Sequence, residues 1–351
     1  MTNAIATDAI VVIGAGIVGL SVACHLRREG HEVVLLDPSA ALAGASFGNA
    51  GSLSPGTVVP MALPGTLRQA WGWLLSRNGP LSVQWRHLPE MGGWIRRFAQ
   101  AGTALGAERA AAALAPLLAH SPVLYRELVG GEAAGRLIRR DGSLTVFRSE
   151  SDWEGSRFGF ELRARNGIAW QEIAGPDLAD FDPMLCKGLY RGVIFPENGH
   201  CADPGALLRE LLAQFRAAGG RFVQARATGF ALSGRRLAAI RTEDRGQIAA
   251  RKAVIAAGAR AAALARSVGD RVLLEAERGY HVMLRGAVGQ PRLPTMDSAK
   301  KFVVTPMAGG VRIAGVAEFV RPGTPPRWRH ARNLLAQGRD LFPVLAESDA
   351  R

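Results

Sequence analysis

One short glycine pattern constrains the fold of this chain more than any other feature. The segment 14–19, with the letters GAGIVG, follows directly on the apolar run 9–13 and precedes a stretch, 20–29, with helical spacing of its apolar residues. A short run rich in β-branched residues is typical of a strand buried on both faces of a parallel sheet. The sequence therefore predicts a strand, a tight turn and a helix, followed by a second strand over 32–36 that ends at Asp37.

The glycines of this segment have separate physical roles in binding a dinucleotide. Gly14 permits the tight turn, Gly16 lets the backbone approach a pyrophosphate, and Gly19 lets the helix pack closely on the strand. The helix start offers free N–H groups and the positive end of its dipole to the phosphates. Asp37 lies where a carboxylate accepts hydrogen bonds from ribose hydroxyls. The predicted contacts of this unit are Gly14, Gly16, Ile17, Val18, Gly19, Asp37 and Pro38.

The glycine pattern alone does not separate NAD from FAD, whereas the segment that follows does. Residues 44–56, GASFGNAGSLSPG, form a small, polar loop where an NAD enzyme normally continues with another strand and helix. The segment resembles the second flavin-contacting loop of the FAD-dependent D-amino-acid oxidase superfamily. In detail it resembles the bacterial D-amino-acid dehydrogenase small subunit, in which a serine, an Asn-Ala-Gly triplet and a Ser-Pro pair recur. The resemblance implies FAD contacts at Ser46, Asn49, Ala50, Gly51, Ser52 and Leu53, and the alternative is an ordinary surface loop.

The resemblance extends to about Phe342. The family places a backbone contact to the adenine at Thr228, in place of its usual valine, and closes over the dinucleotide with Ala257 and Gly258. Segment 277–284 resembles the Gly-Tyr strand of the family's substrate domain. Segments 301–306 and 311–318 resemble the hairpin after that strand.

These correspondences imply an α/β plus α+β fold. A Rossmann-like FAD-binding domain is interleaved with a substrate domain built on an antiparallel or mixed sheet. The FAD-binding domain is expected at 1–60 and 202–272, the substrate domain at 61–201 and 273–329, and a C-terminal helix and tail at 330–351. Family members continue with an Arg-Pro segment that clamps the substrate carboxylate, and then with a glycine-rich segment. Because neither occurs in this sequence, we expect a truncated chain that binds FAD weakly and is poorly active.

The resemblance implies an oxidoreductase that converts the amine of a D-amino acid into an imine, and then into a 2-oxo acid and ammonia. The electrons are expected to pass to a quinone or another respiratory acceptor. Two alternatives stay open: an oxidase of glycine, sarcosine or D-hydroxyproline that uses oxygen, and an inactive or truncated flavoprotein. The cofactor carries the chemistry, so the sequence assigns no catalytic residue. Substrate contacts are expected at Tyr280 and Lys301, which can both bind a carboxylate, and at Ser54 near the flavin ring. The alternative for Tyr280 and Lys301 is a role as a surface or packing residue.

Charge and cysteine usage bear on partners and compartment. The net charge is +13, and all but four of the 43 basic residues are arginines. The basic residues are scattered, with the densest group at 321–332, so the sequence predicts no nucleic-acid partner. The three cysteines are widely spaced without a CxxC pattern, which predicts reduced thiols in the cytoplasm and no metal site. The apolar run 9–24 is too short to span a membrane.

A tryptophan-rich segment suggests one further partner. Trp71, Trp73, Trp85 and Trp94 occur among leucines and arginines. An amphipathic helix of this composition can rest on a membrane surface, here the inner face of the cytoplasmic membrane. The alternative, which we favour, is that these aromatic rings pack inside the substrate domain.

Overall fold

The computed structural model describes residues 8–39, 44–76 and 79–348. Its sheets include a parallel one, antiparallel ones and a mixed one, as expected for an α/β plus α+β fold. The predicted fold class is therefore confirmed.

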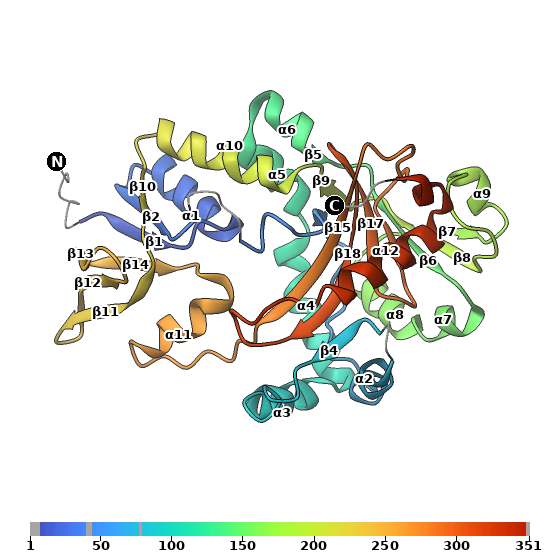
Figure 1. The fold of residues 1–351 in the computed structure, drawn as a ribbon, viewed down its shortest axis with the longest axis horizontal. Coiled ribbons are helices and arrows are strands. Elements are labelled where there is room, and N and C mark those ends of the chain that lie inside the picture. The colour runs from blue at the N-terminus through green and yellow to red at the C-terminus, as the bar shows by residue number, and fades with distance from the viewer. Residues whose placement is uncertain (1–7, 40–43, 77–78, 349–351) are drawn as a thin grey trace. The chain divides into compact units, whose positions relative to one another are not determined.

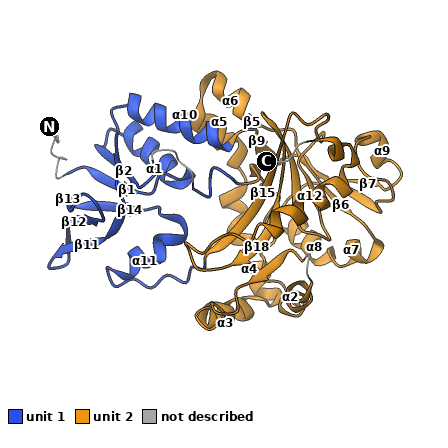
Figure 2. Cartoon of the chain, viewed as in Figure 1, with its two compact units in different colours: residues 1–48, 204–275 blue, residues 49–203, 276–351 orange. Residues whose placement is uncertain are grey.

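The chain forms two compact units, and each draws on two separate segments (Figure 2). Unit 1 comprises 1–48 and 204–275, and unit 2 comprises 49–203 and 276–351. The units thus change over after residues 48, 203 and 275, whereas the domain boundaries drawn from the sequence lie after 60, 201 and 272. The assignment of these segments to an FAD-binding and a substrate domain stays a prediction.

Unit 1 is built on a parallel sheet of strand order β10-β2-β1-β14. Its strands are β1 (Ile10–Ile13), β2 (Val33–Asp37), β10 (Arg221–Gln224) and β14 (Lys252–Ile255). The two N-terminal strands are almost fully buried, which explains their unbroken apolar sequence. Helices α1 (Ile17–Arg28) and α10 (Pro204–Ala217) pack together (Figure 1), and the Arg27 Nε donates to the Ala218 carbonyl at 2.9 Å.

A second, antiparallel sheet of unit 1 follows β10 in sequence. It contains β11 (Ala227–Ser233), β12 (Arg236–Thr242) and β13 (Gln247–Ala249). Phe230, Ile240 and Ile248 from this sheet share one core with Val34 and Leu36 of β2. The 3₁₀ helix η1 (Gly258–Arg260) and helix α11 (Ala261–Arg266) complete the unit.

Unit 2 contains an eight-stranded mixed sheet. The order is β15-β18-β17-β16-β6-β8-β7, and β4 pairs with β18 off this path. The strands are β4 (Leu81–Val83), β6 (Ser143–Phe147), β7 (Gln171–Ala174), β8 (Arg191–Phe195), β15 (Glu277–Arg285), β16 (Thr295–Asp297), β17 (Phe302–Met307) and β18 (Gly310–Phe319). The hairpin expected from the sequence forms as the antiparallel pair β17 and β18.

The two faces of this sheet have different coverings, because successive side chains of a strand point to opposite faces. On one face, Val304, Ile313 and Leu284 share a core with residues of α12 (Arg329–Leu341) and η2 (Pro343–Glu347). Figure 1 shows α12 beside β15 and β18. On the other face, Phe147, Val193 and Phe195 belong to a second hydrophobic cluster.

Short elements complete unit 2. A small antiparallel sheet joins β3 (Ser52–Leu53), β9 (Gly199–Cys201) and β5 (Ile138–Arg139). The remaining helices are α2 (Thr66–Leu75), α3 (Gly92–Ala101), α4 (Ala104–Leu118), α5 (Ser121–Val129), α6 (Gly131–Leu137), α7 (Glu150–Glu154), α8 (Arg157–Arg165) and α9 (Leu178–Phe181). The alanine-rich stretch 101–119 is thus largely helical, as its composition predicts.

Candidate functional site

The turn after β1 in unit 1 has space for glycine only. Gly14 has a φ of +108°, and a Cβ there would lie 2.4 Å from the Ala256 carbonyl oxygen. A Cβ on Gly19 would lie 1.8 Å from the Gly14 carbonyl oxygen. The turn therefore holds the helix start tight against the strand ends, as the sequence pattern requires.

The start of α1 presents its backbone without a side-chain cap of its own. Gly16 is the N-cap residue, and the first turn contains no acidic residue. The Ile17 N–H donates to the Ser46 Oγ at 3.1 Å, which brings the second predicted loop to this helix start within unit 1. Val18 is exposed beside it. An uncapped helix start with close backbone approach is suited to a phosphate group.

Asp37 lies at the carboxyl end of β2 and is fixed by two backbone groups. Its Oδ2 accepts the Ala15 N–H and its Oδ1 accepts the Ser39 N–H, both at 2.8 Å. The next residue, Pro38, accepts the Gln224 Nε2 at 3.2 Å through its carbonyl. The carboxylate is therefore held beside the glycine turn, at the position from which the sequence predicts a contact with a ribose.

The later segments of unit 1 carry three further predicted cofactor contacts, and the structure brings only part of them to the glycine turn. Ala257 lies two residues after β14, and a Cβ on Gly14 would lie 3.1 Å from its Cα. Gly258 follows with a φ of +54°. Thr228 lies on β11, where its Oγ1 donates to the Arg241 carbonyl at 3.2 Å. The structure brings Ala257 to the glycine turn, and no contact places Thr228 there.

The remaining predicted flavin contacts belong to unit 2. The Asn49 Oδ1 accepts the Gly51 N–H at 2.8 Å, and the Asn49 carbonyl accepts Arg312 at 2.7 Å. Gly51 has a φ of +72°, and a Cβ there would lie 2.5 Å from the Cys201 carbonyl oxygen. Ser52 and Leu53 form β3 and pair with β9, while Ala50 lies between the two anchored residues. The loop is therefore fixed to the small sheet.

Tyr280 is part of a buried network on β15 and β18. Its hydroxyl donates to the Glu318 Oε2 at 2.6 Å and accepts the Arg327 N–H at 2.9 Å. Glu318 is 0% exposed and also pairs with Arg278 at 3.3 Å and with the Arg327 Nε at 3.4 Å. Burial, and then the Glu318 carboxylate, raise the pKa of Tyr280. Both functions of the hydroxyl are thus used within the protein, so its predicted substrate contact has no support from geometry.

Lys301 lies in the turn that joins β16 to β17. It has a φ of +56°, which is uncommon for a residue other than glycine, and its N–H donates to the Asp297 carbonyl at 2.9 Å. Its ammonium forms no hydrogen bond or ion pair with the part of the chain that the structure describes. Burial lowers the pKa of Lys301, the negative charges of Asp152 and Asp297 raise it, and the positive charge of Arg163 lowers it. Lys301 is therefore a cation that forms no ion pair within the described part of unit 2.

Arg163 on α8 is a neighbouring cation that the sequence did not reveal. Its Nε donates to the Gly56 carbonyl at 3.0 Å, two residues beyond Ser54, and its guanidinium lies over the Phe160 and Phe195 rings. Burial lowers the pKa of Arg163 to about 10. The sequence gives no signal for it, because α8 has three arginines with the spacing of a solvated helix. Arg163 thus anchors the loop that carries Ser54, and its positive charge acts on Lys301.

An ionic network fixes the turn that carries Lys301. Asp297 is fully buried and accepts the Arg148 Nε at 2.7 Å and the Lys300 N–H at 2.9 Å. Asp340 on α12 accepts Lys300 at 2.6 Å and Arg148 at 2.8 Å. The hydrogen bond from Lys300, and then the positive charge of Arg148, lower the pKa of Asp340. The position of Lys301 is therefore set by Asp297 at the end of β16, Asp340 on α12 and Arg148 just beyond β6.

The described residues, 8–39, 44–76 and 79–348, contain neither a metal-binding cluster nor a membrane-spanning helix. No group of three or more His, Cys, Asp or Glu side chains in them is arranged to hold a metal ion. No helix in them is long and apolar enough to cross a membrane.

The Trp-rich segment divides into packed and exposed rings. Trp94 on α3 stacks on Phe98 at 5.0 Å and contacts Phe319 at 5.2 Å between ring centroids. Trp73 is half-buried, whereas Trp71 and Trp85 are exposed. The packing that we favoured from the sequence thus applies to Trp94.

Comparison with known proteins defines the class. The family model described as FAD dependent oxidoreductase, DAO, matches residues 9–351. The chain belongs to this family, and it is an FAD-dependent oxidoreductase. The resemblance seen in the glycine turn and the 44–56 loop is therefore confirmed, and so is FAD as the cofactor.

Three individual proteins show what the chain is similar to in sequence or in fold. The chain is 39% identical over 339 residues to a D-amino-acid oxidase of Bradyrhizobium diazoefficiens, covering 96% of this chain and 80% of the relative. It is 30% identical to D-amino acid dehydrogenase 2 of Ralstonia nicotianae, with 97% and 83% covered. A glycine oxidase from Bacillus cereus shares the fold, with a TM-score of 0.68 at 17% identity and 98% and 80% covered.

Proposed function

We propose that this enzyme oxidises the amine of a D-amino acid to an imine, which water then hydrolyses to a 2-oxo acid and ammonia. The observation that carries the proposal is the 39% identity to a D-amino-acid oxidase over 96% of the chain. The D-amino acid dehydrogenase at 30% identity supports the same substrate class.

The residues of unit 1 fit the cofactor, because the glycine turn leaves no room for side chains where a pyrophosphate approaches. Gly14, Gly16 and Gly19 would receive the phosphates, and Asp37 would bind a ribose. The loop over Asn49–Leu53 would contact the flavin. FAD, when bound, accepts the hydride that leaves Cα of the amine.

The chain's own task is then to bind and orient the substrate. We infer that Lys301 binds the substrate carboxylate, because its ammonium forms no hydrogen bond or ion pair with the described residues and the Asp297 network fixes its turn. Arg163 adds a second positive charge from α8. The contact predicted for Ser54 belongs to the loop that Arg163 anchors at Gly56.

The electron acceptor and the cellular location of the protein are also proposals. A respiratory acceptor, such as a quinone reached by peripheral contact with the inner face of the cytoplasmic membrane, fits the relatives named dehydrogenase. Oxygen fits the relative named oxidase. The exposed Trp71 and Trp85 support membrane contact, because tryptophan favours the membrane interface.

Anaerobic bleaching of the flavin tests the reaction. Purified protein loaded with FAD is mixed with D-amino acids, their L-enantiomers, glycine and sarcosine, and the flavin absorbance is followed. We expect D-amino acids alone to bleach it. Bleaching by glycine or sarcosine but not by D-amino acids would overturn the proposed substrate class. Hydrogen peroxide formed in air identifies oxygen as the acceptor, whereas turnover only with a quinone identifies a dehydrogenase.

A matched pair of variants tests the substrate contact. Lys301→Met is expected to raise KM for D-amino acids at least about tenfold, the weight of one charge-assisted hydrogen bond, with less effect on kcat. Lys187→Met, an exposed lysine elsewhere in unit 2, is the control. An unchanged KM in Lys301→Met would exclude this contact.

A further inference from the structure

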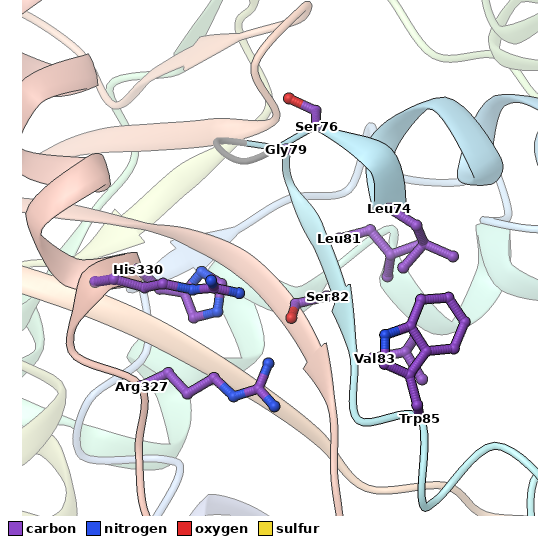
Figure 3. A pocket seen from close by; sticks show the side chains of 10 residues that line it. Leu74, Ser76, Gly79, Leu81, Ser82, Val83, Trp85, Arg327 and His330 are labelled. Carbon is purple, nitrogen blue, oxygen red and sulfur yellow. The ribbon is translucent and has the colours of Figure 1, made fainter.

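A small pocket lies in unit 2 between the end of α2, strand β4 and the start of α12. Its volume is about 90 Å³, enough for one small group. Figure 3 shows Arg327 and His330 on one wall and Ser82 facing them from β4. Neither the predicted flavin contacts nor Lys301 line it.

The lining is positively charged. Arg327 and Arg329 contribute two guanidinium groups, and none of the lining residues is acidic. The nearby carboxylate is Glu318, which is fully buried and pairs with both Arg278 and Arg327. Arg329 forms no ion pair with the described residues. Glu318 thus pairs with two arginines, and Arg329 adds a further positive charge, which leaves a net positive charge at the pocket.

One buried polar group at the pocket, on His330, lacks a partner among the described residues. His330 is 3% exposed, and its Nε2 forms no hydrogen bond within the described residues. Its ring packs on Tyr280 at 5.0 Å between centroids. Burial, and then Arg329, lower the pKa of His330, which favours the neutral ring, and a neutral imidazole has one N–H to donate. Ser82 is 8% exposed, and its hydroxyl, which solvent still reaches, forms no hydrogen bond within the described part of the chain. Unpaired buried polar groups are costly, so a ligand at this position is favoured.

The start of α12 adds to the positive electrostatic potential at the pocket. The helix has 13 residues, no acidic residue in its first turn and no side-chain cap, and His330 is its second residue. The positive end of its dipole is therefore uncompensated at the pocket.

We propose that this pocket binds a phosphate group. Arg327 and Arg329 supply charge, the Ser82 hydroxyl and the His330 imidazole supply hydrogen bonds, and the helix start supplies its dipole. The size of the pocket admits a single phosphate rather than a nucleotide. The exposed Trp85 lines its rim and the exposed Trp328 lies next to Arg327 and Arg329 in sequence, so the phosphate comes either from a soluble compound or from a phospholipid headgroup.

Calorimetric titration of the full chain with inorganic phosphate, at constant ionic strength set by chloride, tests the pocket. We expect saturable binding that Arg329→Gln and Ser82→Ala each weaken about tenfold, the weight of one charge-assisted hydrogen bond. Arg332→Gln removes an exposed arginine of the same helix that does not line the pocket, and should leave binding unchanged. Equal weakening by Arg332→Gln would show a diffuse charge effect and overturn the site.

Vesicle co-sedimentation identifies the source of the phosphate. Binding to phosphatidylglycerol vesicles that is lost in Arg329→Gln, without saturable binding of free phosphate, assigns the site to a lipid headgroup. Saturable binding of free phosphate assigns the site to a soluble ligand. The proposal is refuted if the protein binds neither the vesicles nor free phosphate. Ser82→Ala removes a single oxygen atom, so a folded variant is available even if Arg329→Gln does not fold. Failure of the flavin-bleaching experiment leaves this test unaffected, because the pocket shares no residue with the proposed substrate contacts.

Discussion

Replacing Tyr280 with Phe isolates the hydroxyl of the buried network in unit 2. The change keeps the ring and its packing on His330, and it removes one oxygen. Glu318, which is fully buried, then loses its 2.6 Å hydrogen bond and keeps only its two arginine partners. The Arg327 N–H also loses its acceptor.

The expected cost follows from these two losses. A hydrogen bond to a charged group contributes about 1.5–3 kcal/mol, and a buried N–H left without an acceptor costs about 1–3 kcal/mol. Because Arg327 is only half-buried, water compensates for part of the second loss. Tyr280→Phe is therefore expected to lower the free energy of unfolding of unit 2 by about 2–4 kcal/mol.

Urea unfolding followed by tryptophan fluorescence measures the loss of stability in unit 2 itself. All seven tryptophans belong to unit 2, so their emission reports on that unit alone. The double variant with Glu318→Gln should be less destabilised than the sum of the two single variants, because the residues interact directly. A loss below about 1 kcal/mol, or strict additivity, would refute the network. A raised KM with unchanged stability would instead support the substrate contact predicted from the sequence.

Three further predictions concern other parts of the molecule. Gly19→Ala should abolish flavin retention, measured by absorbance after gel filtration, because the added Cβ would lie 1.8 Å from the Gly14 carbonyl oxygen. Thiol titration of the native protein should label Cys186 first and Cys201 only after unfolding, because burial raises the pKa of Cys201 to about 12 while Cys186 is partly exposed. Asp340→Asn should flatten the acid side of the stability profile: the lowered pKa of Asp340 contributes stability above the ordinary carboxyl pKa of about 4 and loses it as pH falls through the lower folded-state pKa.

Each of these has an outcome that contradicts it. Normal flavin content in Gly19→Ala would show that the glycine turn relaxes. Labelling of Cys201 at the rate of Cys186 in native protein would show that its thiol is accessible. For Asp340→Asn, urea midpoints that fall with acid as steeply as in the unsubstituted protein would remove its ion pairs from the pH dependence.

The sequence predicted those parts of the site that depend on local geometry. The glycine turn and Asp37 are recognisable because a strand, a turn and a helix place them within one short segment. Arg163 and the unpaired His330 are not recognisable, because their surroundings come from elements more than 100 residues away, such as Gly56 for Arg163. Nothing in the sequence indicates the φ of +59° at Val316, which is rare for a β-branched residue.

The strand order of unit 1 has a consequence for how the protein is made. β1 and β2 are synthesised first, yet their outer neighbours β14 and β10 begin at Lys252 and Arg221. On the ribosome, the apolar pair β1 and β2 must wait with both edges open for about 200 residues, or roughly 10–40 s at ordinary elongation rates. Unpaired apolar edges are sites of aggregation. Chaperone occupancy of the nascent chain should therefore begin early and end only after Ile255 has left the ribosome.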